Sequence, residues 1–466
     1  MTTLYTNFEY ATELCDVAKL FFTDAVLLRE DGQADVSVSE KYTDGVYRYL
    51  AAYNGDQEET HFTPFGGELQ AVRFRKRYAK IALYRVLSRV TGKAMPWGSL
   101  TGIRPTKLAR QLAKESSDWQ EVFTNLLDVS SEKTSLVADI LRTQEELRQS
   151  RQNCADLYVG IPFCVSRCSY CSFTSGEIDR LKKYVEPYVD ALCDDISQTL
   201  AFAKKNGIAV NNVYFGGGTP TSLSAQQLDR VMSRIDIEPV EYTVEAGRPD
   251  TVTEDKLKVF KKYGVDRVSI NPQTFNQSVL DVIGRKHTVQ DIYDKYYLAK
   301  QYGFAVNMDL IAGLPTESYE MFVSSIDKAI ELSPDNITVH TLALKRGSIL
   351  KENNYSAAEK DVSEMVRYAR KRLYANGYTP YYMYRQKYMT ENLENVGYCK
   401  KNTACLYNIG IMEEVTDILA CGTNAISKRI FSEEDRIERS ANAKDVITYI
   451  ERYQDYLDKK FELFSR

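Results

Sequence analysis

The chain has 466 residues, of which 44% are hydrophobic and 27% are charged, a composition typical of a globular protein with two or three domains. Its net charge of −4 gives no overall attraction to nucleic acid, so we expect no nucleic-acid partner. No apolar run approaches the roughly 20 residues of a membrane span, and residues 1–9 lack a basic-then-apolar signal, so we expect a cytoplasmic protein without a membrane span.

Residues 1–150 predict an accessory α+β module that begins with a helix near Ala11–Phe22. A basic amphipathic helix follows at Arg73–Val90. Helices of this kind can bind RNA, membranes or acidic partners, although a solvated charged face is the commoner reason for such a pattern. The Gly- and Pro-rich loop Trp97–Lys107 could grip a carboxylate or a phosphate, or could form a tight turn between domains.

The next element is a short apolar strand that ends in a loop with three cysteines, Cys164, Cys168 and Cys171, at spacing C-x3-C-x2-C. Three thiolates on one loop can bind three corners of a 4Fe-4S cluster, and no fourth cysteine follows closely, so one iron would keep an open site. An open iron allows a cluster to bind and cleave a substrate or cofactor. The cysteine loop is therefore the predicted centre of the chemistry.

A zinc site or a disulfide framework fits these three cysteines less well than a cluster does. A structural zinc site needs four ligands, and the three histidines, His61, His287 and His340, lie far from the motif in the sequence. A disulfide framework is not expected in a long chain with nine cysteines and no export signal.

From residue 155 onward, predicted strands alternate with predicted helices. Six β-α repeats indicate a parallel sheet with right-handed crossovers, either open or curled toward a barrel. The strands are Leu157–Ile161, Asn212–Phe215, Tyr242–Glu245, Arg267–Asn271, Val306–Ile311 and Ile337–Leu342, and the helices include Ser224–Ile235, Glu254–Tyr263, Val289–Tyr302 and Tyr319–Leu332.

Polar or glycine-rich segments follow the ends of these strands. In barrels of this kind the chemistry lies at the C-terminal ends of the strands, so we expect the segments to converge on one face. The segments are Gly216-Gly217-Gly218-Thr219, Glu245–Asp250, Asn271–Asn276 and Asp309–Pro315. The three glycines would let the backbone approach a ligand closely.

Residues 377–466 predict a C-terminal module that closes the open side of the barrel. Here a tyrosine-rich run, Tyr378–Tyr384, is followed directly by Arg385-Gln386-Lys387. This order places cations next to aromatic area, which suits a flat, largely apolar ligand with carboxylates.

The cysteine motif, with Tyr170 before the last cysteine, resembles the radical S-adenosylmethionine (SAM) superfamily. Together with Tyr158–Cys164, Phe215–Pro220, Asn271–Asn276 and Asp309–Pro315, it resembles the oxygen-independent coproporphyrinogen III oxidases (dehydrogenases). Trp97–Lys107, Arg385–Lys387 and Glu394–Tyr398 are similar to the HemZ-type branch. The resemblance covers about residues 90–430 and implies a partial (β/α)6 TIM-like barrel over residues 151–376, between the two accessory modules.

The resemblance also implies the residues of the site. Cys164, Cys168 and Cys171 would bind the 4Fe-4S cluster. The SAM at the cluster, and a second SAM or the neighbouring substrate region, would be held by Tyr158, Tyr170, Gly216, Gly217, Gly218, Thr219, Glu245, Gln273, Arg285, Asp309 and Ala343. Arg385 and Lys387 would grip propionates of the substrate, as could Arg285.

The implied reaction converts two propionates of coproporphyrinogen III to vinyl groups, in haem biosynthesis. One or two SAM molecules would bind, a protein such as flavodoxin or ferredoxin would supply electrons, and the chain would act as a monomer.

Two positions depart from the family pattern. Members that make protoporphyrinogen have a fourth cysteine two residues after the third, where this chain has Phe173, and a histidine-bearing signature is replaced by Asn424–Ser427. Related haem chaperones also lack that cysteine. Haem binding, or radical chemistry on another tetrapyrrole, therefore stays open as an alternative.

Overall fold

The structure is a computed structural model that describes residues 1–28, 34–102, 104–115, 118–145, 147, 153–345, 347–353, 355, 361–386, 389–434 and 436–465. It divides into two compact units, residues 1–138 with 391–393, and residues 139–390 with 394–466. The boundary predicted near residue 150 lies outside the described residues. The division predicted at residue 376 stays a proposal.

The first unit is an α+β module. Its five strands are ordered β2-β1-β3-β4-β5, with β1 parallel to both neighbours and the other pairs antiparallel. The strands are β1 (Thr3–Thr6), β2 (Val26–Leu27), β3 (Val36–Thr43), β4 (Val46–Tyr53) and β5 (Asp56–Phe62). The helices are α1 (Ala11–Ala18), α2 (Glu68–Thr91), α3 (Pro105–Glu115), α4 (Trp119–Glu121), the π-helical turn η1 (Val122–Leu126) and α5 (Ser131–Gln144), which continues into the second unit.

Helix α2 is the basic helix that the sequence predicts. Its apolar face, which includes Leu83 and Leu87, packs into one hydrophobic core with Tyr49 of β4. On its polar face, the Arg75 guanidinium donates two hydrogen bonds of 2.9 and 2.7 Å to the Glu40 carboxylate. Part of the charge of this helix is therefore neutralised within the unit itself.

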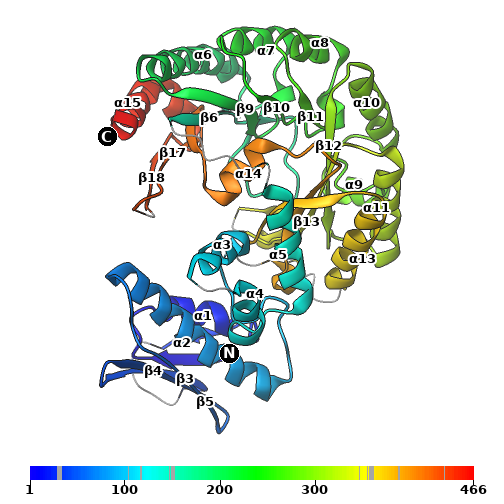
Figure 1. Cartoon of the computed structure of the whole chain (residues 1–466). Coiled ribbons are helices and arrows are strands. Elements are labelled where there is room, and N and C mark those ends of the chain that lie inside the picture. The colour runs from blue at the N-terminus through cyan, green and yellow to red at the C-terminus, as the bar shows by residue number, and fades with distance from the viewer. Residues whose placement is uncertain are drawn as a thin grey trace. The chain divides into compact units, whose positions relative to one another are not determined.

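The second unit is built on an 11-stranded sheet of order β14-β15-β13-β12-β11-β10-β9-β6-β16-β17-β18. The six predicted strands form its centre and are parallel throughout, which confirms the predicted α/β fold. They are β6 (Cys154–Ile161), β9 (Ala209–Gly217), β10 (Glu241–Val244), β11 (Arg267–Ser269), β12 (Ala305–Ala312) and β13 (Asn336–Thr341). Figure 1 shows α6, α7, α8, α10, α11 and α13 in an arc outside these strands, the arrangement of a partial barrel.

The helices of the second unit are α6 (Lys182–Lys205), α7 (Ala225–Met232), α8 (Glu254–Lys262), α9 (Gln277–Val282), α10 (Val289–Gln301), α11 (Tyr319–Leu332), α12 (Ile349–Glu352), α13 (Val362–Ala375), α14 (Leu406–Glu413) and α15 (Val446–Ser465), with short 3-10 turns η2 (Pro220–Ser222), η3 (Pro249–Thr251) and η4 (Thr390–Asn392). Hydrophobic spacing and Ser or Thr caps explain many of their starts. For example, the side chain of Ser224 accepts a hydrogen bond from the Gln227 backbone N–H at the start of α7.

The C-terminal strands extend both edges of the parallel sheet. Strands β14 (Thr379–Tyr384) and β15 (Asn395–Cys399) join antiparallel beside β13. Strand β16 (Asp417–Cys421) pairs parallel with β6 and is followed by the antiparallel strands β17 (Ile426–Phe431) and β18 (Arg436–Ala441). Helix α14 lies inside the arc of helices (Figure 1). The C-terminal segment therefore lines the inside of the barrel as well as its edges.

A buried polar network fixes α15 to α6 near the strand that leads to the cysteines. The Asp195 carboxylate, 2% exposed, accepts hydrogen bonds from Lys460 Nζ at 2.7 Å, the Tyr449 hydroxyl at 2.6 Å and the Gly422 backbone N–H at 3.1 Å. Gly422 packs so closely on Gly160 of β6 that a side chain there would overlap the Gly160 carbonyl. The C-terminal helix therefore supports the strand from which the cysteine loop emerges.

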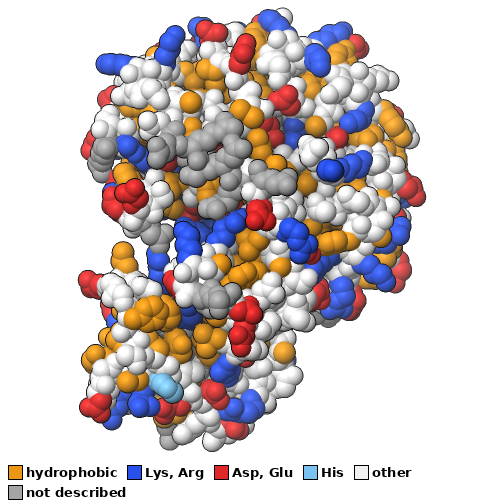
Figure 2. All heavy atoms as spheres, viewed as in Figure 1, with side chains coloured by type: hydrophobic (Ala, Val, Ile, Leu, Met, Phe, Trp, Pro, Cys, Tyr) orange, Lys and Arg blue, Asp and Glu red, His pale blue; other side chains and the backbone are white. Residues whose placement is uncertain are grey.

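Acidic and basic side chains are interspersed on the face seen in Figure 2, which agrees with the small net charge. Within the described residues, no helix combines the length and the apolar character that crossing a membrane requires.

Candidate functional site

The cysteine loop leaves the sheet directly after β6. Phe163 and Cys164 form the short strand β7, which pairs with β8 (Gly176–Glu177). Cys164 Sγ lies 3.4 Å from Ser175 Oγ and 3.5 Å from Thr219 Oγ1. The glycine run after β9 lies alongside: a Cβ atom on Gly218 would lie 2.6 Å from the Phe163 carbonyl oxygen and 3.1 Å from Cys164 Sγ. Glycine is therefore required there by space beside the thiol.

A single cavity of about 360 Å³ runs from this loop into the barrel. Five predicted residues, from five successive strands or the loops that follow them, all line it: Cys164, Gly217, Glu245, Gln273 and Asp309, of which Asp309 lies inside β12. Tyr170, Gly218, Thr219, Arg285 and Ala343 also line it, as do the other two motif cysteines, Cys168 and Cys171. Most of the predicted site residues are thus brought together on one surface.

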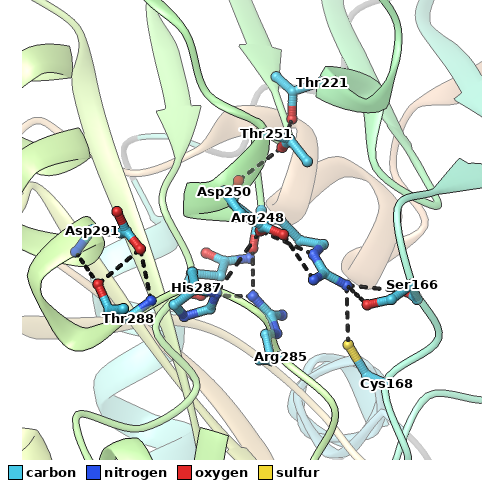
Figure 3. A network of polar contacts seen from close by, with 12 residues as sticks. Ser166, Cys168, Thr221, Arg248, Asp250, Thr251, Arg285, His287, Thr288 and Asp291 are labelled. Atoms are coloured by element: carbon cyan, nitrogen blue, oxygen red, sulfur yellow. Dashed lines mark hydrogen bonds and ion pairs between the residues drawn. The ribbon is translucent and has the colours of Figure 1, made fainter. Parts of the chain in front are cut away.

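Two buried arginines contact the cysteine loop, and Figure 3 shows Arg248 with its contacts to Ser166 and Cys168. Arg248, which follows β10, donates from Nη1 to the Ser166 carbonyl at 3.1 Å and lies 3.9 Å from Cys168 Sγ. Arg285 donates to the Tyr170 hydroxyl at 3.0 Å and to two backbone carbonyls, those of Gly247 and Asn271, at 2.9 and 3.0 Å. These three hydrogen bonds fix the Arg285 side chain in place within the protein.

A carboxyl group faces the cavity at the end of β10. Glu245 accepts a hydrogen bond from the Tyr214 hydroxyl at 2.5 Å, and Tyr214 stacks on Tyr407 of α14 with ring centroids 4.3 Å apart. Burial raises the pKa of Glu245 to about 7. This group can therefore hold or release a proton near neutral pH.

A second carboxylate, Asp309 of β12, lies in a different environment. It accepts hydrogen bonds of 2.8 Å from the side chains of Asn271 and Asn307, and His340 Nε2 lies 3.5 Å from it. Burial acts to raise the pKa of Asp309, but the hydrogen bond and charge of His340 outweigh it and hold the pKa below the ordinary value. Tyr384 lies 3.5 Å from the other His340 nitrogen. Asp309 therefore stays an anion that can bind a hydroxyl or an ammonium group.

Gln273 shows local strain at the cavity wall. Its φ of 67° lies in the left-handed region, which is uncommon for a residue with a side chain. Its backbone is held between Asp309 and Ile311 of β12 by hydrogen bonds of 2.9 and 3.0 Å, while its buried Oε1 atom has no hydrogen-bond partner among the described residues. A strained, unsatisfied amide at a cavity is typical of a ligand site.

Some predicted site residues lie off the cavity. Tyr158 and Gly216 pack behind its wall, where Tyr158 stacks with Tyr214 at 6.4 Å. Arg385 is buried, with 4% exposed, and does not line the cavity, whereas its neighbour Gln386 does. Lys387 lies outside the described residues. The substrate role of Arg385 and Lys387 stays a prediction.

All three motif cysteines line the cavity, which is the donor set that the predicted cluster requires. Among the described residues, no three His, Cys, Asp or Glu side chains are arranged to hold one metal ion. Thiols that each bind a different iron of a cluster lie farther apart than ligands of a single ion. Burial raises the pKa of Cys171 to about 11, so a thiolate there needs a bound metal to stabilise it.

Several cavity residues could not be found from the sequence. In the sequence, His340 counts only against a zinc site, because it lies far from the cysteines, yet it shares a face of β13 with Thr338, and both line the cavity. Arg248 stands in the segment Glu245–Asp250, but nothing in its spacing points to Cys168. Three tyrosines of the run Tyr378–Tyr384 also line the cavity: Tyr381, Tyr382 and Tyr384. The sequence indicates only that this run offers aromatic area, not which of its rings face a ligand.

Comparison with known proteins points to one group. Residues 136–329 match the family model for the radical SAM superfamily. The chain is 36% identical to the oxygen-independent coproporphyrinogen-III oxidase-like protein HemZ of Bacillus subtilis (strain 168), over 97% of this chain and 95% of that protein. It is 30% identical to the haem chaperone HemW of Escherichia coli (strain K12), over 66% of this chain and 80% of that protein.

A solved structure gives the same fold. The coproporphyrinogen III oxidase HemN of Escherichia coli, a radical SAM enzyme, superposes with a TM-score of 0.51 at 22% identity, over 67% of this chain and 72% of that one. At this identity the likeness concerns the fold alone.

Proposed function

The chain belongs to the HemZ-type family of oxygen-independent coproporphyrinogen-III oxidase-like proteins, within the radical SAM superfamily, and on this premise we propose that it converts propionates of coproporphyrinogen III to vinyl groups without oxygen. Each propionate would lose one β-hydrogen, carbon dioxide and one electron, and the electron would pass to an acceptor. The observation that carries the proposal is the convergence, on one cavity, of the three motif cysteines and of residues from four further strands or the loops that follow them.

Bound at this loop, a 4Fe-4S cluster and SAM would supply a radical able to take a hydrogen atom from an unactivated C–H bond. We propose that Cys164, Cys168 and Cys171 hold the cluster. The backbone of Gly217 and Gly218 gives SAM close access to it, and the Glu245 and Asp309 carboxylates bind its hydroxyl or ammonium groups. The barrel walls keep water from the reacting atoms.

The size of the cavity constrains the substrate. Cavities that bury a drug-sized ligand measure about 300–1,000 Å³, and this one, at about 360 Å³, lies near the lower end. We therefore propose that a propionate arm reaches inward while the tetrapyrrole ring stays at the rim, where Phe173 is 70% exposed.

Further parts of the proposal rest on the family alone. A low-potential partner such as flavodoxin or ferredoxin would supply the electron that starts the reaction. We also propose a cytoplasmic monomer divided into parts 1–150, 151–376 and 377–466.

The test is anaerobic incubation of the reconstituted protein with SAM, dithionite and coproporphyrinogen III. We expect 5′-deoxyadenosine together with a product that has lost carbon dioxide from its propionates. Formation of 5′-deoxyadenosine without change in the tetrapyrrole would refute the substrate and leave a radical SAM enzyme acting on another molecule.

One observation favours a second candidate, a haem-binding protein. Phe173 stands where protoporphyrinogen-forming members carry a fourth cysteine, and it is an exposed aromatic ring on the rim of the cavity. Several relatives of the chain are named haem chaperones. Stoichiometric haem binding without any turnover in the same incubation would support this candidate.

A further inference from the structure

Arg248 occupies an unusual position for a charged side chain. Only 3% of it is exposed, and it lies beside Ser166 and Cys168 of the cysteine loop (Figure 3). Its Nε and Nη2 atoms bind the two carboxylate oxygens of Asp250 at 3.2 and 3.0 Å. The third nitrogen, Nη1, donates to the Ser166 carbonyl at 3.1 Å and the Ser166 hydroxyl at 2.8 Å, and lies 3.9 Å from Cys168 Sγ.

This geometry fixes both the place and the direction of the charge. The paired hydrogen bonds to Asp250 lock the plane of the guanidinium, because a carboxylate matches two of its parallel N–H groups. The remaining edge then has to face the loop. Cys168, 8% exposed, is the most buried of the three motif cysteines, so solvent screens this charge weakly.

An arginine would not be needed at position 248 if its only role were to tie the cysteine loop to the sheet. The hydrogen bonds to Ser166 already tie the loop to the end of β10, and Arg285 ties it a second time through Tyr170. A lysine or a neutral donor would make a comparable tie to a carbonyl. A rigid, permanently charged group aimed at a sulfur atom does more, because hydrogen bonds to the sulfurs of an iron–sulfur cluster help to set its reduction potential.

We propose that Arg248 is a positioning residue that makes the cluster at Cys164, Cys168 and Cys171 easier to reduce, with Asp250 fixing its orientation. The inference rests on the proposed function, since it requires the cluster. Reduction adds one electron, drawn from the external reductant, and so one negative charge to the cluster. The fixed positive charge beside Cys168 favours that added charge, and no proton has to move.

The experiment compares reduction potentials of anaerobically reconstituted wild-type protein and Arg248→Gln. Each protein is titrated with dithionite under redox mediators, and the reduced cluster is quantified by electron paramagnetic resonance. Gln can still donate to Ser166 but carries no charge. We expect at least a tenfold loss in the equilibrium constant for reduction, which is about 59 mV for a one-electron couple. Arg248→Lys should restore part of it.

A charge elsewhere in the second unit serves as the control. Arg230→Gln removes an equal charge from α7, where Arg230 pairs with Glu186 at the surface, and should leave the potential unchanged.

The outcomes are distinguishable. An unchanged or raised potential in Arg248→Gln at full iron content would overturn the inference. If Arg248→Gln assembles no cluster, Arg248→Lys decides: a potential below that of the wild type supports the inference, and an unchanged or raised potential overturns it. A wild-type protein that assembles no cluster would refute the proposed function, and the inference with it.

Discussion

The space beside Cys164 offers a sharp test of the site. A Cβ atom on Gly218 would lie 2.6 Å from the Phe163 carbonyl oxygen, 3.0 Å from the Phe163 carbonyl carbon and 3.1 Å from Cys164 Sγ. Two of these neighbours are backbone atoms of β7, which cannot move as a side-chain tip can. Gly218→Ala must therefore displace the strand that carries the first cysteine.

Overpacking of this kind costs about 1–3 kcal/mol of the free energy of unfolding. We expect that loss in urea denaturation, together with reduced iron content and visible absorption after anaerobic reconstitution. Gly67→Ala is the matched control, because a Cβ atom there meets nothing within 4 Å and the backbone is extended. Native stability and full iron content in Gly218→Ala would refute the view that β7 and the glycine run share one tightly packed site.

Three further predictions concern buried charges. Lys460→Met leaves the buried Asp195 carboxylate without its cation and should lower the free energy of unfolding by about 3–5 kcal/mol in urea denaturation. The double variant Asp195→Asn/Lys460→Met should recover much of this loss. A loss in the single variant no larger than in the double would argue against a buried ion pair. Burial raises the pKa of Glu245 from 4.5 to about 7, so the stability contributed by its bound proton is fully present below pH 4.5 and is lost as the pH rises through 7. Glu245→Gln should therefore make the unfolding free energy less dependent on pH in that window, and an unchanged pH profile would contradict the burial of this carboxyl. Arg385→Ala should weaken tetrapyrrole binding by about 1.5–3 kcal/mol, measured by anaerobic titration, without changing SAM affinity. Equal loss of both ligands, or loss of neither, would mean that the tetrapyrrole is held elsewhere or is not the substrate.

The sequence predicted the centre of the fold because local signals and tertiary contacts agree there. All six central strands and four of their helices appear at the predicted places. The buried parallel strands read as apolar runs in the sequence, and clear helix starts separate one run from the next. Strands β10 and β11 end one to two residues earlier than predicted, which frees Glu245 and Asn271 to turn into the cavity.

The rest depended on contacts between segments far apart in the chain. Nothing local in Tyr158 reveals that its ring stacks behind the cavity, since strand position alone does not fix which ring faces a ligand. Arg248 approaches Cys168 from 80 residues away, and Asp309 meets His340 only because β12 and β13 are neighbours. Buried charges are placed by such pairings, which a single sequence does not record.

The central claim is that the loop of Cys164, Cys168 and Cys171 holds a cluster that cleaves SAM. Its most direct test is the rate of 5′-deoxyadenosine formation by anaerobically reconstituted Cys168→Ala with SAM and dithionite. The matched control is Cys193→Ala, which alters a buried cysteine of α6 that does not line the cavity. We predict that Cys168→Ala loses both its visible absorption and all SAM cleavage, while Cys193→Ala keeps both. Cleavage of SAM by Cys168→Ala at the wild-type rate would contradict this claim.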